Sequence, residues 1–173
     1  MALFYPTMYR RRITDVMAED LHRLGVRGIL LDVDNTLTTH DNPNLTDGVR
    51  EWLDRMQEEG FLLLIVSNNV EERVSSFAEK IGLPFCAHAR KPLPCGYKQA
   101  AALLGISKKE CVAIGDQIFT DILGANFSGI SSVLLEPIEP EVEQKFIAFK
   151  RKVERLLLNN RHQRRRREND YGR

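Results

Sequence analysis

Residues 31–38 read LDVDNTLT, and they follow directly on an apolar run that begins at Gly28. The run Gly28-Ile29-Leu30-Leu31 is too short for a helix and leads into polar, turn-forming residues. Such a run is typical of a strand that is buried on both faces of a sheet. Asp32 and Asp34 alternate with Val33 on chain that is still extended, so their side chains point the same way. We therefore expect a pair of carboxylates at the exit of a buried strand.

Strand-like and helix-like segments alternate along the rest of the chain. Strands are expected at 28–32, 61–66, 84–88, 111–114 and 131–135, and helices at 13–24, 47–59, 71–81, 96–104 and 118–125. This alternation predicts an α/β fold of three layers, a Rossmann-like parallel sheet with helices on both faces. After Pro140, apolar residues at helical spacing up to Leu156 predict a last helix that docks on the sheet or on a partner. Residues 1–159 are expected to form one domain, followed by a disordered basic tail at 160–173.

Composition and charge narrow the class of protein. The chain has 173 residues, of which 43% are hydrophobic and 28% charged, as in ordinary globular domains. The 25 Lys and Arg nearly balance the 24 Asp and Glu, but residues 1–149 carry a net charge of −6 and residues 150–173 one of +7. The three cysteines form no CxxC pair, and no apolar run approaches the roughly 20 residues of a membrane span. We expect a cytoplasmic protein.

Polar side chains follow four of the expected strands, where ligands bind in an open parallel sheet. They are Asp32 and Asp34, then Ser67 with Asn68 and Asn69, then Lys91, then Asp116 with Asp121. Taken singly, Asp116, Asp121 or Ser67 would serve as a helix cap and Lys91 as a solvated loop residue, but the succession of polar residues at four strand exits favours a site. Clustered carboxylates favour Mg²⁺, and Lys91 adds the charge that suits a transferring phosphoryl group.

These segments together resemble the four motifs of the haloacid dehalogenase superfamily of phosphotransferases. The motifs are LDVDNTLT at 31–38, IVSNN at 65–69, KP at 91–92 and GDQIFTD at 115–121. Within the superfamily the chain is most similar to the YqeG-like branch of the subfamily IIIA phosphatases, which resembles the phosphatidylglycerophosphate phosphatases. The resemblance implies a hydrolase, a phosphomonoesterase that depends on Mg²⁺.

The resemblance also implies a role for each carboxylate. Asp32 would be the nucleophile that forms an aspartyl-phosphate, and Asp34 would be the general acid and then the general base. Mg²⁺ would be held by Asp32, Asp116 and the backbone carbonyl of Asp34. Asp121 would orient the metal site from outside the ligand shell.

The phosphoryl group of the substrate would be bound by Asp32, Ser67, Asn68 and Lys91. Eight residues separate Leu37 from Thr46, and 21 separate Asn69 from Lys91, so no cap domain fits between the motifs. Without a cap domain, the edge of the sheet that carries the site is open to solvent, which favours a large substrate. The resemblance implies a phospholipid such as phosphatidylglycerophosphate. A homo-oligomer would be another source of selectivity.

Two flanking segments are candidates for contact with partners. Residues 4–12 interleave aromatic side chains with three arginines, which fits either an anionic lipid surface or packing on the domain. Arg164–Arg167 fits an anionic membrane, RNA or a solvated tail. An RNA- or protein-binding module on a phosphatase core is therefore the second function class, although no aromatic platform for RNA accompanies the tail.

Overall fold

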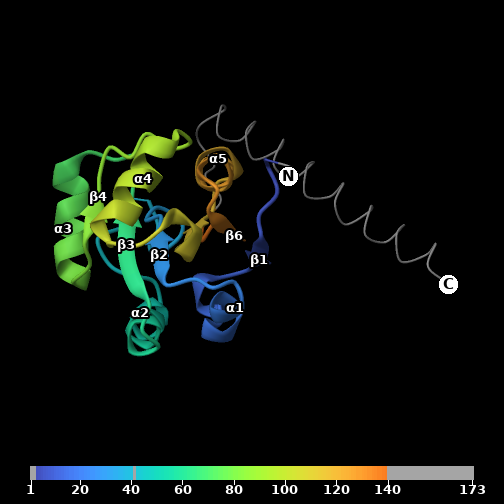
Figure 1. The fold of residues 1–173 in the computed structure, drawn as a ribbon. Helices are drawn as coiled ribbons and strands as arrows, with labels where there is room; N and C mark the ends of the chain where they lie inside the picture. Colours follow the sequence, from blue (N-terminus) through green and yellow to red (C-terminus); the bar gives the residue numbers. More distant parts are fainter. Residues whose placement is uncertain (1–2, 41, 140–173) are drawn as a thin grey trace. The chain divides into compact units, whose positions relative to one another are not determined.

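The computed structural model describes residues 3–40 and 42–139, in which a six-stranded parallel sheet carries helices on both faces (Figure 1). The strand order is β1-β6-β5-β2-β3-β4. The strands are β1 Met8–Arg10, β2 Gly28–Leu31, β3 Leu62–Val66, β4 Phe85–Cys86, β5 Cys111–Gly115 and β6 Ser131–Leu135. The chain leaves β2 toward β3 and β4, then crosses back to β5 on the other side of β2. The predicted Rossmann-like α/β fold is confirmed.

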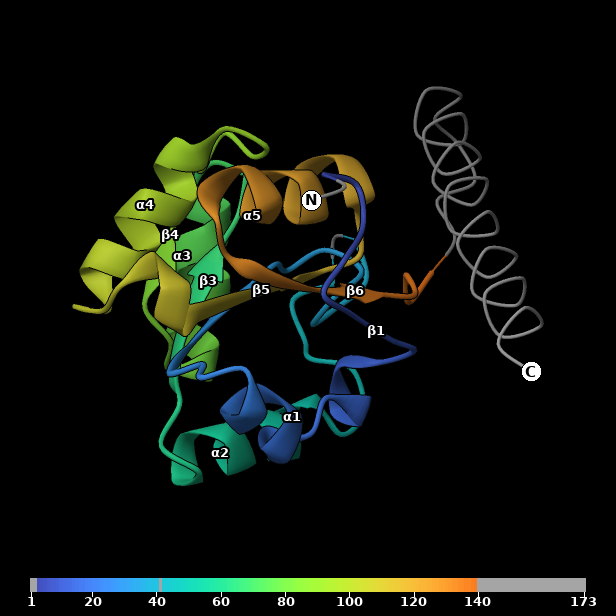
Figure 2. The same ribbon diagram turned by 45° about the vertical axis from the view of Figure 1, so that its right-hand side comes forward.

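Helices cover both faces of the sheet (Figure 2), and each face has its own core. In β2, Ile29 and Leu31 belong to one core and Leu30 to the other. The first core includes α1 Ala18–Arg23, α2 Val49–Glu58 and α3 Glu71–Ile81, and the second includes α4 Pro94–Leu103 and α5 Leu123–Ser128. Because both faces are covered, β2 reads as an unbroken apolar run instead of an alternating one.

The helix expected at 13–24 is interrupted. Residues Ile13–Asp15 form a single 3₁₀ turn, and α1 begins only at Ala18. Between them Val16 is extended, and its carbonyl accepts a hydrogen bond of 2.9 Å from the indole N–H of Trp52 in α2. This long-range bond uses a carbonyl that a continuous helix would need for itself.

The N-terminal segment contains a strand that the sequence did not predict. Met8, Tyr9 and Arg10 pair in parallel with Val133, Leu134 and Leu135 of β6. The ring of Phe4 packs edge-on against Phe119 at 5.7 Å between centroids. Of the two interpretations of residues 4–12, the structure shows packing on the domain. A strand of three residues is too short for a periodic pattern to reveal it.

The other elements follow the prediction closely, with two shifts. The strand expected at 84–88 is reduced to β4, and the helix expected at 118–125 opens with a π-helical turn, Ile118–Ile122, before α5. No helix in the described part of the chain has the length and hydrophobicity needed to cross a membrane. The helix expected after Pro140 and the tail at 160–173 lie outside the described residues, as do the contacts expected of Arg164–Arg167.

Trp52→Phe tests the bond that joins α2 to the N-terminal segment. Trp52 is 1% exposed, and Phe would leave a small cavity and remove the donor to the Val16 carbonyl. We expect the free energy of unfolding to fall by about 2 kcal/mol in urea titrations followed by circular dichroism. Phe127→Leu, at a side chain 50% exposed, is the control and should cost less than about 0.5 kcal/mol. Equal losses in the two variants would contradict this account.

Candidate active site

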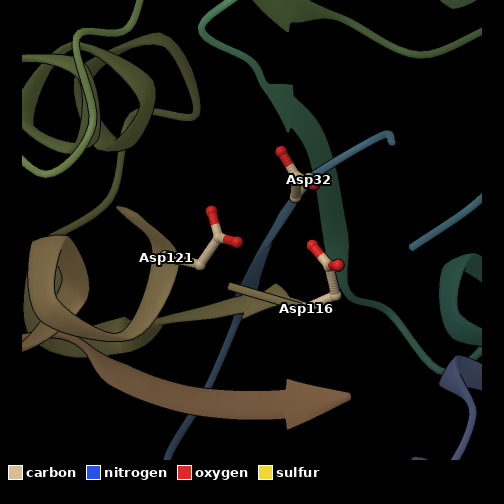
Figure 3. A group of neighbouring side chains, drawn as sticks. All are labelled: Asp32, Asp116 and Asp121. Atoms are coloured by element: carbon tan, nitrogen blue, oxygen red, sulfur yellow. The ribbon is translucent and has the colours of Figure 1, made fainter. Parts of the chain in front are cut away.

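The candidate site lies where the order of strands reverses, between the carboxyl ends of β2 and β5. Sheets of this kind bind ligands at that point. Asp32 follows β2 and Asp116 follows β5, and the two strands run in register, with Leu31 opposite Ile114. Asp121 comes from the π-helical turn before α5, an irregularity often found at functional sites. Figure 3 shows the three carboxylates converging from these separate elements.

The three carboxylates are close enough to share one cation. One oxygen each from Asp32, Asp116 and Asp121 lies within 4.8 Å of the others. The buried ammonium of Lys91 contacts Asp32 Oδ1 at 2.5 Å and Asp121 Oδ1 at 2.7 Å. The three carboxylates can carry more negative charge than this one lysine neutralises. Their oxygens are the ligands that a hard divalent cation such as Mg²⁺ prefers.

The pKa values of Asp32 and Lys91 reflect the excess of acidic groups in the cluster. Burial raises the pKa of Asp32; Lys91 opposes that rise, and the charges of Asp121 and Asp116 add to it. For Lys91, burial alone would lower the pKa, but Asp121 and Asp32 together hold it well above its ordinary value. Lys91 therefore stays protonated. A bound cation would favour the ionised form of Asp32 and so relieve the remaining repulsion.

Asp121 is held in place from several directions. Its Oδ2 accepts a hydrogen bond of 3.1 Å from the backbone N–H of Gln117, and the hydroxyl of Tyr97 donates to its backbone carbonyl at 3.2 Å. Gly115 leaves the space that its carboxylate occupies, since a Cβ there would lie 2.4 Å from Asp121 Oδ2. Only glycine permits this close approach of β5 to the carboxylate.

The Asn68 side chain contacts the Lys91 backbone. Its Nδ2 donates to the Lys91 carbonyl at 3.0 Å, and its Oδ1 accepts from the Lys91 N–H at 2.7 Å. The sequence predicts that Asn68 binds the substrate phosphate; the structure shows instead that its amide binds the backbone of the loop that carries Lys91. No local pattern could have revealed a contact between residues 23 positions apart.

Ser67 and Asp34 lie beside the cluster, at the ends of β3 and β2. Ser67 is 2% exposed, and its hydroxyl accepts a hydrogen bond from the Asn69 N–H at 3.2 Å. The Asp34 carboxylate is not part of the three-carboxylate group. It accepts a hydrogen bond of 2.7 Å from Asn69 Nδ2 and forms an ion pair of 2.8 Å with Arg73 of α3. The sequence does not single out Arg73, because an arginine in the first turns of an amphipathic helix is typical of a solvated residue.

The chain is similar to known hydrolases and phosphatases. The family of haloacid dehalogenase-like hydrolases matches residues 39–129. The chain is 40% identical over 157 residues to the probable phosphatase YqeG of Bacillus subtilis, with 90% of each chain covered. It is 28% identical over 149 residues to phosphatidylglycerophosphate phosphatase 1, chloroplastic/mitochondrial, of Arabidopsis thaliana, over 81% of this chain and 42% of that protein.

Among solved structures, an uncharacterized protein from Listeria monocytogenes serotype 4b superposes with a TM-score of 0.58 at 21% identity. The superposition covers 69% of this chain and 85% of that one, and it bears on the fold alone. The family match spans more than half of the chain, and the bacterial relative is aligned over nearly all of its length. The chain therefore belongs to the haloacid dehalogenase-like hydrolases, which confirms the resemblance seen in its motifs and makes it an enzyme.

Proposed function

We propose that this hydrolase is a Mg²⁺-dependent phosphomonoesterase that acts through an aspartyl-phosphate on Asp32. One observation carries the proposal: Asp32, Asp116 and Asp121 meet within 4.8 Å, and Lys91 bonds two of them. Carboxylates, a fixed ammonium and room for a cation are what stabilisation of a transferring phosphoryl group requires. Membership of the hydrolase family supports the same chemistry.

The metal would be held by Asp32, Asp116 and the backbone carbonyl of Asp34. The family resemblance puts Asp121 outside the ligands, where it would orient the site; its two carboxylate oxygens accept hydrogen bonds from Lys91 and Gln117. When bound, Mg²⁺ supplies positive charge to the phosphoryl oxygens and the attacking carboxylate.

The reaction takes two steps on the chain's own residues. First, an oxygen of Asp32 bonds to phosphorus, the bond from phosphorus to the ester oxygen breaks, and Asp34 gives its proton to the departing alcohol. A water oxygen then attacks phosphorus, Asp34 takes a proton from that water, and the bond to Asp32 breaks to release inorganic phosphate. Ser67 and Lys91 hold the phosphoryl oxygens in both steps.

The substrate we propose is a monoester of a large alcohol, with the lipid phosphatidylglycerophosphate as the leading example. The similarity to the plant phosphatase of that name supports this choice. The lack of a cap domain after β2 also supports it. Residues 32–40 and 42–48, as described, contain an isolated bridge between Asp34 and Thr38 but no inserted domain. A capless site admits a substrate that is much larger than the phosphate it loses.

Asp32→Asn removes the proposed nucleophile while keeping the shape of the side chain. We expect turnover of p-nitrophenyl phosphate with Mg²⁺ present to fall by at least about 10³-fold. Asp54→Asn, at a carboxylate of α2 that is 53% exposed, is the matched control and should keep the wild-type rate. Turnover by Asp32→Asn within tenfold of wild type would be incompatible with the mechanism.

Removal of metal tests the role of the carboxylate cluster. Treatment with EDTA should abolish hydrolysis, and Mg²⁺ in excess should restore it. Because a ligand that binds only the folded state stabilises it, Mg²⁺ should also raise the Tm of the wild-type protein. Asp116→Asn should lose most of this rise. An equal rise in both proteins would show that Mg²⁺ binds elsewhere.

Gly115→Ala tests the close approach of β5 to Asp121. The added methyl group would displace the Asp121 carboxylate, which bonds Lys91, so we expect kcat to fall at least about tenfold. The assay should be run well below the Tm of the variant, so that lost stability does not enter the rate. An unchanged kcat would mean that the position of Asp121 does not matter for the reaction.

A further inference from the structure

A groove of about 490 Å³ leads away from the candidate site along α3. Asp34 and Ser67 line one part of it, and Val74, Phe77 and Lys80 of α3 line another. These three helix residues follow one another at spacings of three, so they form one stripe along the helix. The groove is thus continuous with the residues that would hold the phosphoryl group and protonate the departing alcohol.

The walls of the groove are largely apolar. Val74 and Phe77 are 3% and 7% exposed and belong to the core, and Pro43 also lines the groove. Val70, just before α3, is 52% exposed. An exposed aliphatic side chain beside a reaction site offers contact to the carbon skeleton of a substrate.

Two basic residues line the groove, and in the described part of the chain only one of them has an ion-pair partner. Arg73 is paired with Asp34 at 2.8 Å, and exposed Glu72 also lines the groove. Lys80 lies seven residues beyond Arg73, or about 10 Å along the helix. Its ammonium forms no ion pair with any residue of 3–40 or 42–139. The groove therefore runs from the reaction site over apolar surface to the ammonium of Lys80, which has no ion-pair partner among the described residues.

We propose that this groove binds the alcohol part of the substrate and that Lys80 binds a second anionic group on it. The inference rests on the proposed function, since it needs the ester phosphate beside Ser67 and the ester oxygen beside Asp34. The substrate class is a phosphate monoester whose alcohol carries a further phosphate or phosphodiester. A lipid phosphodiester and a small soluble bisphosphate share this chemistry.

The test compares Lys80→Gln with wild type on esters that differ in the second anion. Glycerol phosphate has a neutral alcohol, glycerol bisphosphate a soluble anionic one, and dihexanoyl phosphatidylglycerophosphate a lipid phosphodiester. In wild type, kcat/KM should be higher for the two anionic esters than for glycerol phosphate. In Lys80→Gln this preference should fall about fivefold, mainly through KM, as expected for a partly exposed ion pair.

The matched control is Lys98→Gln, which removes an exposed lysine of α4, on the other face of the sheet. It should keep the wild-type preference. The inference is overturned if wild type shows no preference for an anionic alcohol, or if Lys80→Gln retains it in full. Whichever anionic ester has the higher kcat/KM identifies the source, lipid or soluble, and both results support a second anion. Failure of wild type to hydrolyse any ester, p-nitrophenyl phosphate included, would instead overturn the proposed function itself.

Discussion

The buried ammonium of Lys91, bonded to Asp32 and Asp121, is the interaction on which the rest of the site depends. Its side chain is 3% exposed, and a buried charge is tolerated only with its partners in place. The surrounding structure keeps them there. Asn68 binds the backbone of Lys91, while Gly115 leaves room for the carboxylate of Asp121. The buried lysine thus couples the loops after β2, β4 and β5.

Topology explains how residues so far apart in sequence meet. The chain leaves β2 in one direction and returns to β5 on its other side, so the ends of these two strands lie together. Parallel pairing aligns their carboxyl ends, and each exit loop adds its polar side chains to the same edge. The site therefore has two parts. One holds the three clustered carboxylates and Lys91, and the other, at the groove, holds Asp34 and Arg73.

Much of the fold and the identity of the candidate residues could be predicted from sequence, because both leave local patterns. The buried run before Asp32 marks a central strand, and the apolar spacing of residues 71–81 gives the bounds of α3 as observed. The contacts that position these residues cannot be predicted from a local sequence pattern. Trp52 reaches Val16 over 36 positions and Arg73 reaches Asp34 over 39, and only the packed structure reveals such pairs. The π-helical turn that carries Asp121 was likewise hidden, because it begins as an ordinary apolar helix would.

In the proposed mechanism, Asp32 carries the phosphoryl group during the reaction. Acid quenching of the enzyme during turnover with Mg²⁺, followed by borohydride reduction and peptide mass spectrometry, measures this directly. An acyl phosphate is reduced to an alcohol, so we expect homoserine in place of aspartate at position 32 and nowhere else. Reduction at a different carboxylate, or none while turnover proceeds, would contradict it.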